Sequence, residues 1–361
     1  MKEALERQIL ELVPPGIGAS LAATGTRLRM GVEAGRAAVA LTLGYPLSGE
    51  AAGGLRAAVA SALAAQAVEL ASFELNHRIV AHAVQPNVSP SPRARNIIAI
   101  GSGKGGVGKS TTAVNLALAL AAEGARVGVL DADVYGPSIP TMLGLTGRPD
   151  SPDGKSIEPM RAHGLEAMSI GLMVEADTPM IWRGPMATSA LTQLLTETLW
   201  GGETGLDYLI VDLPPGTGDI QLTLAQKIPV AGAIIVTTPQ DVATLDARKA
   251  LKMFEKVQVP VLGLIENMAV HVCTNCGHVE HLFGQGGGER MAAQYGVPLL
   301  GSLPLEIGIR EQGDAGVPIV AASPDSAAAM AYRQIARRMA ALLATRPRAA
   351  MPIASSLVGI S

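Results

Sequence analysis

The clearest chemical pattern in the sequence is a glycine-rich stretch that ends in lysine, serine and threonine. It reads Gly103-Lys104-Gly105-Gly106-Val107-Gly108-Lys109-Ser110-Thr111. The spacing G-x-x-x-x-G-K-S is that of a phosphate-binding loop, in which closely spaced glycines let backbone N–H groups surround phosphate oxygens without side-chain clashes. In such a loop Lys109 reaches the β- and γ-phosphates, and the hydroxyl of Ser110 binds Mg²⁺. The sequence therefore predicts a site for ATP and Mg²⁺.

Acidic residues that suit phosphoryl transfer follow two other apolar runs. Asp212 ends the run 208–211 and is expected to hold Mg²⁺ directly or through water. Asp133 is expected to orient the attacking water. The alternative is that Asp131 or Asp133 only caps the following turn. The loop at 214–219 follows Asp212 and is suited to sense the γ-phosphate through backbone N–H groups.

A second chemical cluster contains the two cysteines of the chain, Cys273 and Cys276, beside three histidines. A C-x-x-C pair places two thiolates on one loop, near enough for a shared metal or cluster. A [4Fe–4S] cluster usually takes four cysteines, so two identical chains that contribute two thiolates each would complete it across a two-fold axis. This interpretation makes Cys273 and Cys276 metal ligands and the protein a homodimer.

Three alternatives for the cysteine pair stay open. Zinc could be held within one chain by both cysteines and two of the histidines His271, His278 and His281. The cysteines could form a dithiol redox pair, although no helix led by a cysteine follows as in thioredoxin-like motifs. They could also be structural residues buried as small apolar groups. Covalent haem attachment is excluded, because C-x-x-C-H needs histidine where this chain has Gly277.

Short apolar runs alternate with helical patterns from Asn96 onward, and these runs define the elements that position the chemistry. Because the runs are continuously apolar rather than alternating, they predict an α/β fold with a mostly parallel sheet covered by helices on both faces. Ligands of such sheets bind beyond the carboxyl ends of the strands, where the glycine-rich loop, Asp133 and Asp212 would converge. A helix is expected at 111–122, and strands at 97–101, 127–131, 165–170, 208–213, 233–237, 261–266 and 299–301.

The chain is expected to contain a second, smaller unit. Residues 1–83 are predicted to form a small α+β domain and residues 96–345 the ATP-binding domain. In the small domain a helix is expected before Pro14, a hairpin of strands 27–32 and 36–43, a helix at 50–66 and a strand at 68–75. Residues 84–95 are rich in proline and serine and are expected to be an extended linker. Residues 346–361 form a C-terminal tail.

Composition and charge argue against several other classes of protein. The 361 residues carry a net charge of −3 and no basic block, so neither nucleic acid nor membrane is expected as a partner. Acidic residues stand near the N-terminus where a secretory signal has basic and then apolar residues. Nor is there a stretch of about 20 uncharged apolar residues. We expect a soluble, cytoplasmic protein.

The glycine-rich loop resembles that of the deviant Walker A ATPases, the class that contains MinD, ParA and the nitrogenase iron protein, because Lys104 stands at its front. In that class this lysine reaches across a dimer whose subunits enclose the nucleotides. The resemblance implies that Lys104 binds the phosphates of the partner subunit and takes part in catalysis. A solvated lysine without a role is the alternative. The dimer implied by Lys104 agrees with the dimer that four thiolates require.

From about residue 96 to about residue 340 the sequence resembles the Mrp/ApbC family of P-loop iron–sulfur cluster carriers. The resemblance rests on the glycine-rich loop, the segments 131–138, 182–186 and 211–219, and Glu266-Asn267-Met268 followed by the cysteine pair. It implies ATP binding and hydrolysis, a cluster bridged by two subunits, and its exchange with iron–sulfur donor proteins and recipient apoproteins. It also implies that Asn267 recognises adenine; the alternative is packing in a loop at a strand end.

Two further segments have similarities that assign no catalytic role. The segment with Trp182 and Arg183 is expected to line the dimer surface, with Arg183 as a contact to phosphate or partner. The N-terminal unit is similar to the small iron–sulfur-assembly domain often fused to this family, but it lacks the Asp-Pro-Glu and the cysteine of many relatives. Because no cysteine precedes Cys273, this unit cannot hold a cluster by thiolates. Partner docking or regulation remains for it.

Two main functions are compatible with these patterns. The first is a cluster-carrying ATPase, whose nucleotide state governs the shape of a dimer. The second is a positioning ATPase of the MinD or ParA kind, because residues 328–343, with Arg333, Arg337 and Arg338, could imitate a basic membrane-binding helix. That helix is followed by a tail, and the second function gives the cysteines no task. A zinc-binding P-loop ATPase is a further alternative.

Overall fold

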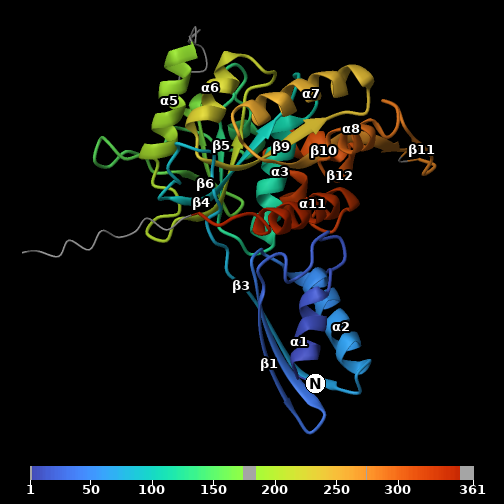
Figure 1. Cartoon of the computed structure of the whole chain (residues 1–361). Coiled ribbons are helices and arrows are strands. Elements are labelled where there is room, and N and C mark those ends of the chain that lie inside the picture. The colour runs from blue at the N-terminus through green and yellow to red at the C-terminus, as the bar shows by residue number, and fades with distance from the viewer. Residues whose placement is uncertain (1, 174–183, 274, 350–361) are drawn as a thin grey trace, which may run out of the picture.

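The computed structural model describes residues 2–173, 184–273 and 275–349. Within these residues the strands form a small N-terminal sheet and a large sheet, and helices cover both faces of the large one (Figure 1). The predicted α/β fold with a small α+β unit is confirmed.

The N-terminal unit follows the predicted order of elements. Ala34 and Gly35, at the turn of its hairpin, both have positive φ (47° and 75°), as a two-residue turn that matches the strand twist requires. The first two strands are antiparallel, and the second and third are parallel. The elements are α1 (Lys2–Glu11), β1 (Arg27–Glu33), β2 (Arg36–Leu43), α2 (Gly49–Ala64) and β3 (Glu69–His77).

The large sheet has the strand order β11-β10-β9-β4-β8-β5-β7-β6, and β12 also pairs with β10. Its parallel strands correspond to those predicted: β4 (Ala94–Gly101), β5 (Val127–Asp131), β7 (Leu165–Ser169), β8 (Leu206–Asp212), β9 (Val230–Thr237), β10 (Val261–Val272) and β12 (Leu299–Pro304). The short β6 (Met160–Ala162) and β11 (Val279–Glu280) pair antiparallel, and the sequence analysis did not predict them.

Helices cover the two faces of the large sheet in separate groups. One face carries α3 (Lys109–Ala122) and α11 (Ala327–Ala344), with the shorter α4 (Ile139–Met142), α9 (Ile307–Asp314) and α10 (Ile319–Ala322). The other face carries α5 (Gly184–Glu197), α6 (Asp219–Lys227), α7 (Asp241–Lys256) and α8 (Gly287–Tyr295), seen above the sheet in Figure 1. None of the helices in the described ranges is long and apolar enough to cross a membrane.

The segment that joins the two sheets is held against the large unit. Gln85 is buried, donates to the carbonyl of Ala225 (3.0 Å) and accepts from the N–H of Val230 (3.0 Å). The buried His82 lies with its Nδ1 2.9 Å from Oδ1 of Asn96. The backbone of residues 347 and 349 pairs with that of residues 83 and 81. The proposed domain limits at 83, 95 and 345 stay a prediction.

Candidate nucleotide site and cysteine loop

The glycine-rich loop connects β4 to α3, as its sequence predicts. Gly106 and Gly108 both have φ of 79°, a left-handed conformation that favours glycine. A Cβ at Gly105 or Gly106 would meet no other atom within 4 Å, so this side of the loop is open. A Cβ at Gly103, by contrast, would clash with the backbone of α7 at Asp246. The loop is thus closely packed on one side and free to receive phosphate on the other.

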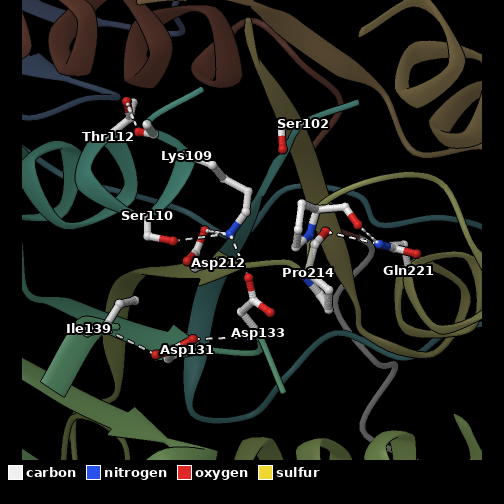
Figure 2. Close-up of polar contacts among 12 residues, drawn as sticks. Ser102, Lys109, Ser110, Thr112, Asp131, Asp133, Ile139, Asp212, Pro214 and Gln221 are labelled. Atoms are coloured by element: carbon white, nitrogen blue, oxygen red, sulfur yellow. Dashed lines mark hydrogen bonds and ion pairs between the residues drawn. The ribbon is translucent and has the colours of Figure 1, made fainter. Parts of the chain in front are cut away.

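Lys109, the first residue of α3, is the buried centre of a network of charges (Figure 2). Its Nζ donates to Oδ1 of Asp212 at 2.6 Å and to Oγ of Ser110 at 3.2 Å. Oδ2 of Asp133 lies 3.7 Å from the same nitrogen. The ends of β5 and β8 and the start of α3 therefore bring together Lys109, Ser110, Asp133 and Asp212, as the strand order predicts.

The donors around Lys109 fit a magnesium ion. Oδ2 of Asp212 is buried and has no hydrogen-bond partner among the described residues, which is unfavourable unless a cation or water satisfies it. Burial raises the pKa of Asp212, and the Lys109 ammonium opposes that rise. A carboxylate and a hydroxyl are the oxygen ligands that Mg²⁺ prefers. Asp212 and Ser110 would hold the ion, as the sequence predicts.

The sequence left open whether Asp131 or Asp133 only caps the turn after β5, and the structure shows different contacts for the two residues. Asp131 accepts hydrogen bonds from the N–H groups of Asp133 and Ile139 and from the hydroxyl of Ser169, each at 3.1 Å. It therefore holds the chain after β5 in place. Burial and the nearby charge of Asp212 raise the pKa of Asp131 to about 7. Asp133 accepts from the N–H of Tyr135 (3.3 Å) and also faces Lys109; its role toward water stays a prediction.

Asn267 lies between the glycine-rich loop and a cavity. Its Nδ2 donates to the carbonyl of Val107 at 2.9 Å, so the packing role is present. The same residue lines a cavity of about 310 Å³ beside the start of α3, together with Thr111, Ile309 and Tyr332. A base joined to phosphates in the loop would lie there. Recognition of adenine by Asn267 stays a prediction.

Lys104 and the loop after Asp212 are connected to each other through Ser102. Lys104 is half-buried, and no ion pair of its ammonium group is present among the described residues. Ser102 joins the two loops, because its hydroxyl donates to the carbonyl of Lys104 (2.9 Å) and its carbonyl accepts from the N–H of Gly216 (3.0 Å). The N–H of Gly216 is thus already used, and Gln221 anchors the same loop by donating to the carbonyls of Pro214 and Pro215.

The cysteine pair lies in the turn between β10 and β11. Cys273 directly follows β10; its N–H donates to the carbonyl of His278 and its carbonyl accepts from the N–H of Gly277, both at 2.9 Å. Backbone N–H groups of Cys276 and Asn275 lower the pKa of Cys273. Both thiols are free, Cys273 being half-buried and Cys276 exposed. The alternative of buried structural cysteines is therefore wrong.

The neighbouring histidines do not complete a metal site within one chain. Nδ1 of His271 lies 3.1 Å from the carbonyl of Leu305, and Nδ1 of His281 lies 3.0 Å from that of Ala269. Among the described residues no three or more His, Cys, Asp or Glu side chains are grouped to hold a metal ion. This geometry gives no support to zinc held inside one chain.

Comparison with known proteins follows the same division of the molecule. A family model named ParA and described as NUBPL iron-transfer P-loop NTPase matches residues 93–340. The chain belongs to this family. The predicted P-loop ATPase is thereby confirmed, and so is the resemblance stated from the motifs. The match covers the large sheet and both candidate sites but not the N-terminal unit.

Relatives in this P-loop NTPase family are named for iron–sulfur clusters. The chain is 58% identical over 271 residues to the iron–sulfur cluster carrier protein of Pseudomonas fragi, with 74% of this chain and 93% of the relative covered. It is 59% identical over 272 residues to that of Escherichia coli K12, covering 75% and 73%. It is 49% identical over 264 residues to the iron–sulfur cluster transfer protein NUBPL of Mus musculus, covering 73% and 82%.

Solved structures support the fold. A nucleotide-binding protein from Archaeoglobus fulgidus in complex with ADP aligns with a TM-score of 0.55 at 38% identity, covering 62% of this chain and 87% of that one. The septum site-determining protein MinD of Pyrococcus horikoshii, complexed with Mg-ADP, aligns with a TM-score of 0.50 at 24% identity, covering 67% and 94%, and shows the fold alone.

Two predicted residues are outside the described part of the structure, and two residues that line the cavity were not predicted. Trp182 and Arg183 are outside the described residues, so their expected place at a dimer surface stays a prediction. Sequence reasoning did not find Tyr332 and Ile309, which line the cavity from α11 and α9. They follow the loop by some two hundred residues and carry no motif, so only the packing of α11 against α3 reveals them.

Proposed function

We propose that this protein is an iron–sulfur cluster carrier that binds and hydrolyses ATP, holds a [4Fe–4S] cluster between two copies of itself and delivers it to apoproteins. The observation that carries the proposal is the pair of free thiols at the end of β10, without further ligands grouped around it among the described residues. Two copies would supply four thiolates, the usual ligand set of such a cluster. The names of the relatives support the same cargo.

The chemistry of ATP hydrolysis would use the charges around Lys109. Lys109 would bind the β- and γ-phosphates, and Asp212 with Ser110 would hold Mg²⁺, which neutralises the charge that develops on the phosphates. Asp133, whose Oδ2 lies 3.7 Å from the Lys109 ammonium, would orient the attacking water. Lys104 is free of ion pairs in the described part of the chain and would reach the phosphates of the second copy.

The dimer and the exchange partners belong to the proposal as well. Two copies related by a two-fold axis would satisfy both Lys104 and the cysteine pair, whereas one copy satisfies neither. The cluster would come from an iron–sulfur donor protein and pass to recipient apoproteins. The cytoplasmic location, and the absence of nucleic acid and membrane among the partners, stay predictions from the sequence.

The competing function of a positioning ATPase fits the geometry less well. Its membrane-binding helix would have to be α11, but Tyr332, Ile335 and Met339 of that helix are buried. Two of its arginines are directed at the protein: Arg333 lies 2.8 Å and Arg337 3.8 Å from Oε1 of Glu123. A helix held in this way is not free to enter a lipid surface.

The test is anaerobic reconstitution with iron and sulfide. The absorbance spectrum, the oligomeric state and the content of iron, sulfide and zinc are then measured. The wild type should bind four irons per dimer, the content of one [4Fe–4S] cluster, whereas Cys273→Ala should bind none. His278→Ala is the matched control, because His278 is an exposed residue of the same turn, and it should retain the cluster. A colourless wild type with stoichiometric zinc would overturn the proposal.

A further inference from the structure

The C-terminal end of α3 carries a fully buried carboxylate, that of Glu123. Its Oε1 accepts from Nε of Arg333 at 2.9 Å, and a second guanidinium nitrogen of Arg333 lies 2.8 Å away. Its Oε2 accepts from the backbone N–H of Ser48 at 2.7 Å and from the Ser48 hydroxyl at 3.1 Å. A buried carboxylate is tolerated only with such partners. Ser48, Glu123 and Arg333, which we call the clamp, thus join the start of α2, the end of α3 and the middle of α11.

The N-terminal unit packs closely on α11 around the clamp. A Cβ on Gly16 would lie 3.2 Å from Nε2 of Gln334, and one on Gly44 would lie 3.3 Å from the Cβ of Ala344. Figure 1 shows the N-terminal unit directly below α11. The unit is therefore docked on two helices of the ATPase by the hydrogen bonds of Ser48 to the buried Glu123 and by close approach of its backbone to side chains of α11.

The same two helices also contribute to the nucleotide site, α3 through its N-terminal end and α11 through a residue beside the clamp. α3 begins with Lys109 and Ser110, which are proposed to contact the phosphates and Mg²⁺, and its Thr111 lines the cavity beside Asn267. Tyr332, which lines that cavity from α11, is the residue next to Arg333. α3 is buried over most of its length, and close-packed helices transmit displacement because they do not deform continuously. A shift of α3 or α11 on nucleotide binding must therefore move the partners of Ser48.

We propose that the N-terminal unit regulates the nucleotide site through the clamp, so that docking of this unit and binding of nucleotide strengthen each other. The proposal gives a task to a unit that has no cysteine and lies outside the family match. It needs nucleotide binding alone and is independent of the nature of the cargo. Because coupling between two binding events is reciprocal, it can be measured from either side.

The experiment compares the full-length wild type with Arg333→Gln, which leaves Glu123 buried without its main counter-charge. ADP affinity is measured by calorimetry, and amide exchange at residues 45–52 reports docking, because the Ser48 N–H is bonded to Glu123. We expect faster exchange at Ser48 in the variant and an ADP dissociation constant raised about fivefold or more. In the wild type, saturating ADP should slow the exchange of the Ser48 amide.

The matched control is Arg126→Gln, because Arg126 also pairs with a mostly buried carboxylate, that of Asp207 at 3.2 Å, but outside the clamp. It should bind ADP as the wild type does. Ser48→Ala, which removes only the hydroxyl, should change both readouts in the same direction by less, and it serves if Arg333→Gln does not fold. Faster exchange with unchanged ADP affinity would overturn the coupling, and unchanged exchange in both clamp variants would overturn the clamp itself.

Discussion

The nucleotide site and the cysteine loop differ in how complete each is within one chain. Lys109, Asp131 and Asp212 are buried and bonded to one another or to the backbone. In the cysteine loop Cys276 is exposed, and the apolar side chains of Val272 and Val279 nearby are about half exposed, at 47% and 53%. The difference teaches that folding of one chain buries and pairs the charges of the first site, whereas it leaves the second exposed, as the proposed sharing of the thiols between two copies requires.

The largest expected effect tests the buried side of this comparison. Lys109→Ala should reduce ATP turnover at least about a hundredfold, because the ammonium group buried beside the phosphate position would no longer stabilise the charge of the transferring phosphoryl group. It should also lower the free energy of unfolding of the nucleotide-free protein by about 3 kcal/mol, because Asp212 is left buried without its counter-charge. Urea unfolding and phosphate release measure the two effects.

Lys104→Ala is the control for Lys109→Ala, because it removes a lysine from the same loop that has no ion pair in the described part of the chain. Its free energy of unfolding should stay within about 0.5 kcal/mol of the wild type. Equal destabilisation by the two substitutions would contradict the buried network. Addition of Asp212→Asn to Lys109→Ala should restore part of the lost stability.

The pH dependence of stability tests Asp131. Its pKa is about 7 in the folded chain against 3.8 ordinarily, so the folded state binds this proton more tightly than the unfolded state. The stabilisation is fully present below about pH 4 and is lost as the pH rises through about 7. Nucleotide-free wild type should therefore lose more stability between about pH 5 and about pH 8 than Asp131→Asn does, as urea titrations would show. Parallel curves for the two proteins would refute this assignment.

Asn267→Ala tests the border between loop and cavity. The substitution removes one hydrogen bond to the carbonyl of Val107, so the free energy of unfolding should fall by about 1 kcal/mol. If Asn267 also recognises the base, ADP affinity should fall about tenfold and the preference for ADP over GDP should shrink. A loss of stability with unchanged nucleotide preference would leave Asn267 with a packing role alone.

The smallest effect on stability is expected in the cysteine loop. Cys276→Ser should change the free energy of unfolding by no more than about 0.5 kcal/mol, because the thiol is exposed and belongs to no buried cluster. The same variant should lose all reconstituted iron. Destabilisation comparable to that of Lys109→Ala would break the comparison and make the loop part of the folded core.

Sequence predicted the large sheet well because its strands are continuous apolar runs. The phosphate-loop glycines and the acids at the ends of β5 and β8 were placed correctly, since the carboxyl ends of parallel strands meet at one edge. The short β6 and β11 were not predicted, because strands of two or three residues carry no periodicity.

Contacts between distant segments were the part that sequence could not supply. Nothing local indicates that the ring nitrogens of His271 and His281 lie beside backbone carbonyls rather than near the thiols. Equally, the buried position of Gln85 within a proline-rich segment depends on α6 and β9, far along the chain. Such pairings are set by tertiary packing, which overrides composition.

Strand β10 carries both ends of the proposed activity. Asn267 lies on β10 and lines the cavity beside the glycine-rich loop, and Cys273 is the first residue after the same strand. The two residues are six positions apart, which is about 20 Å at the rise of an extended chain. Met268 has φ of 57° and the pairing of β10 with β12 shifts register between Glu266 and Val270. The regular pairing of the strand is therefore interrupted between the two sites. A rotation of about 5° there would move the thiols by about 1 to 2 Å, enough to break the geometry of an iron–thiolate bond.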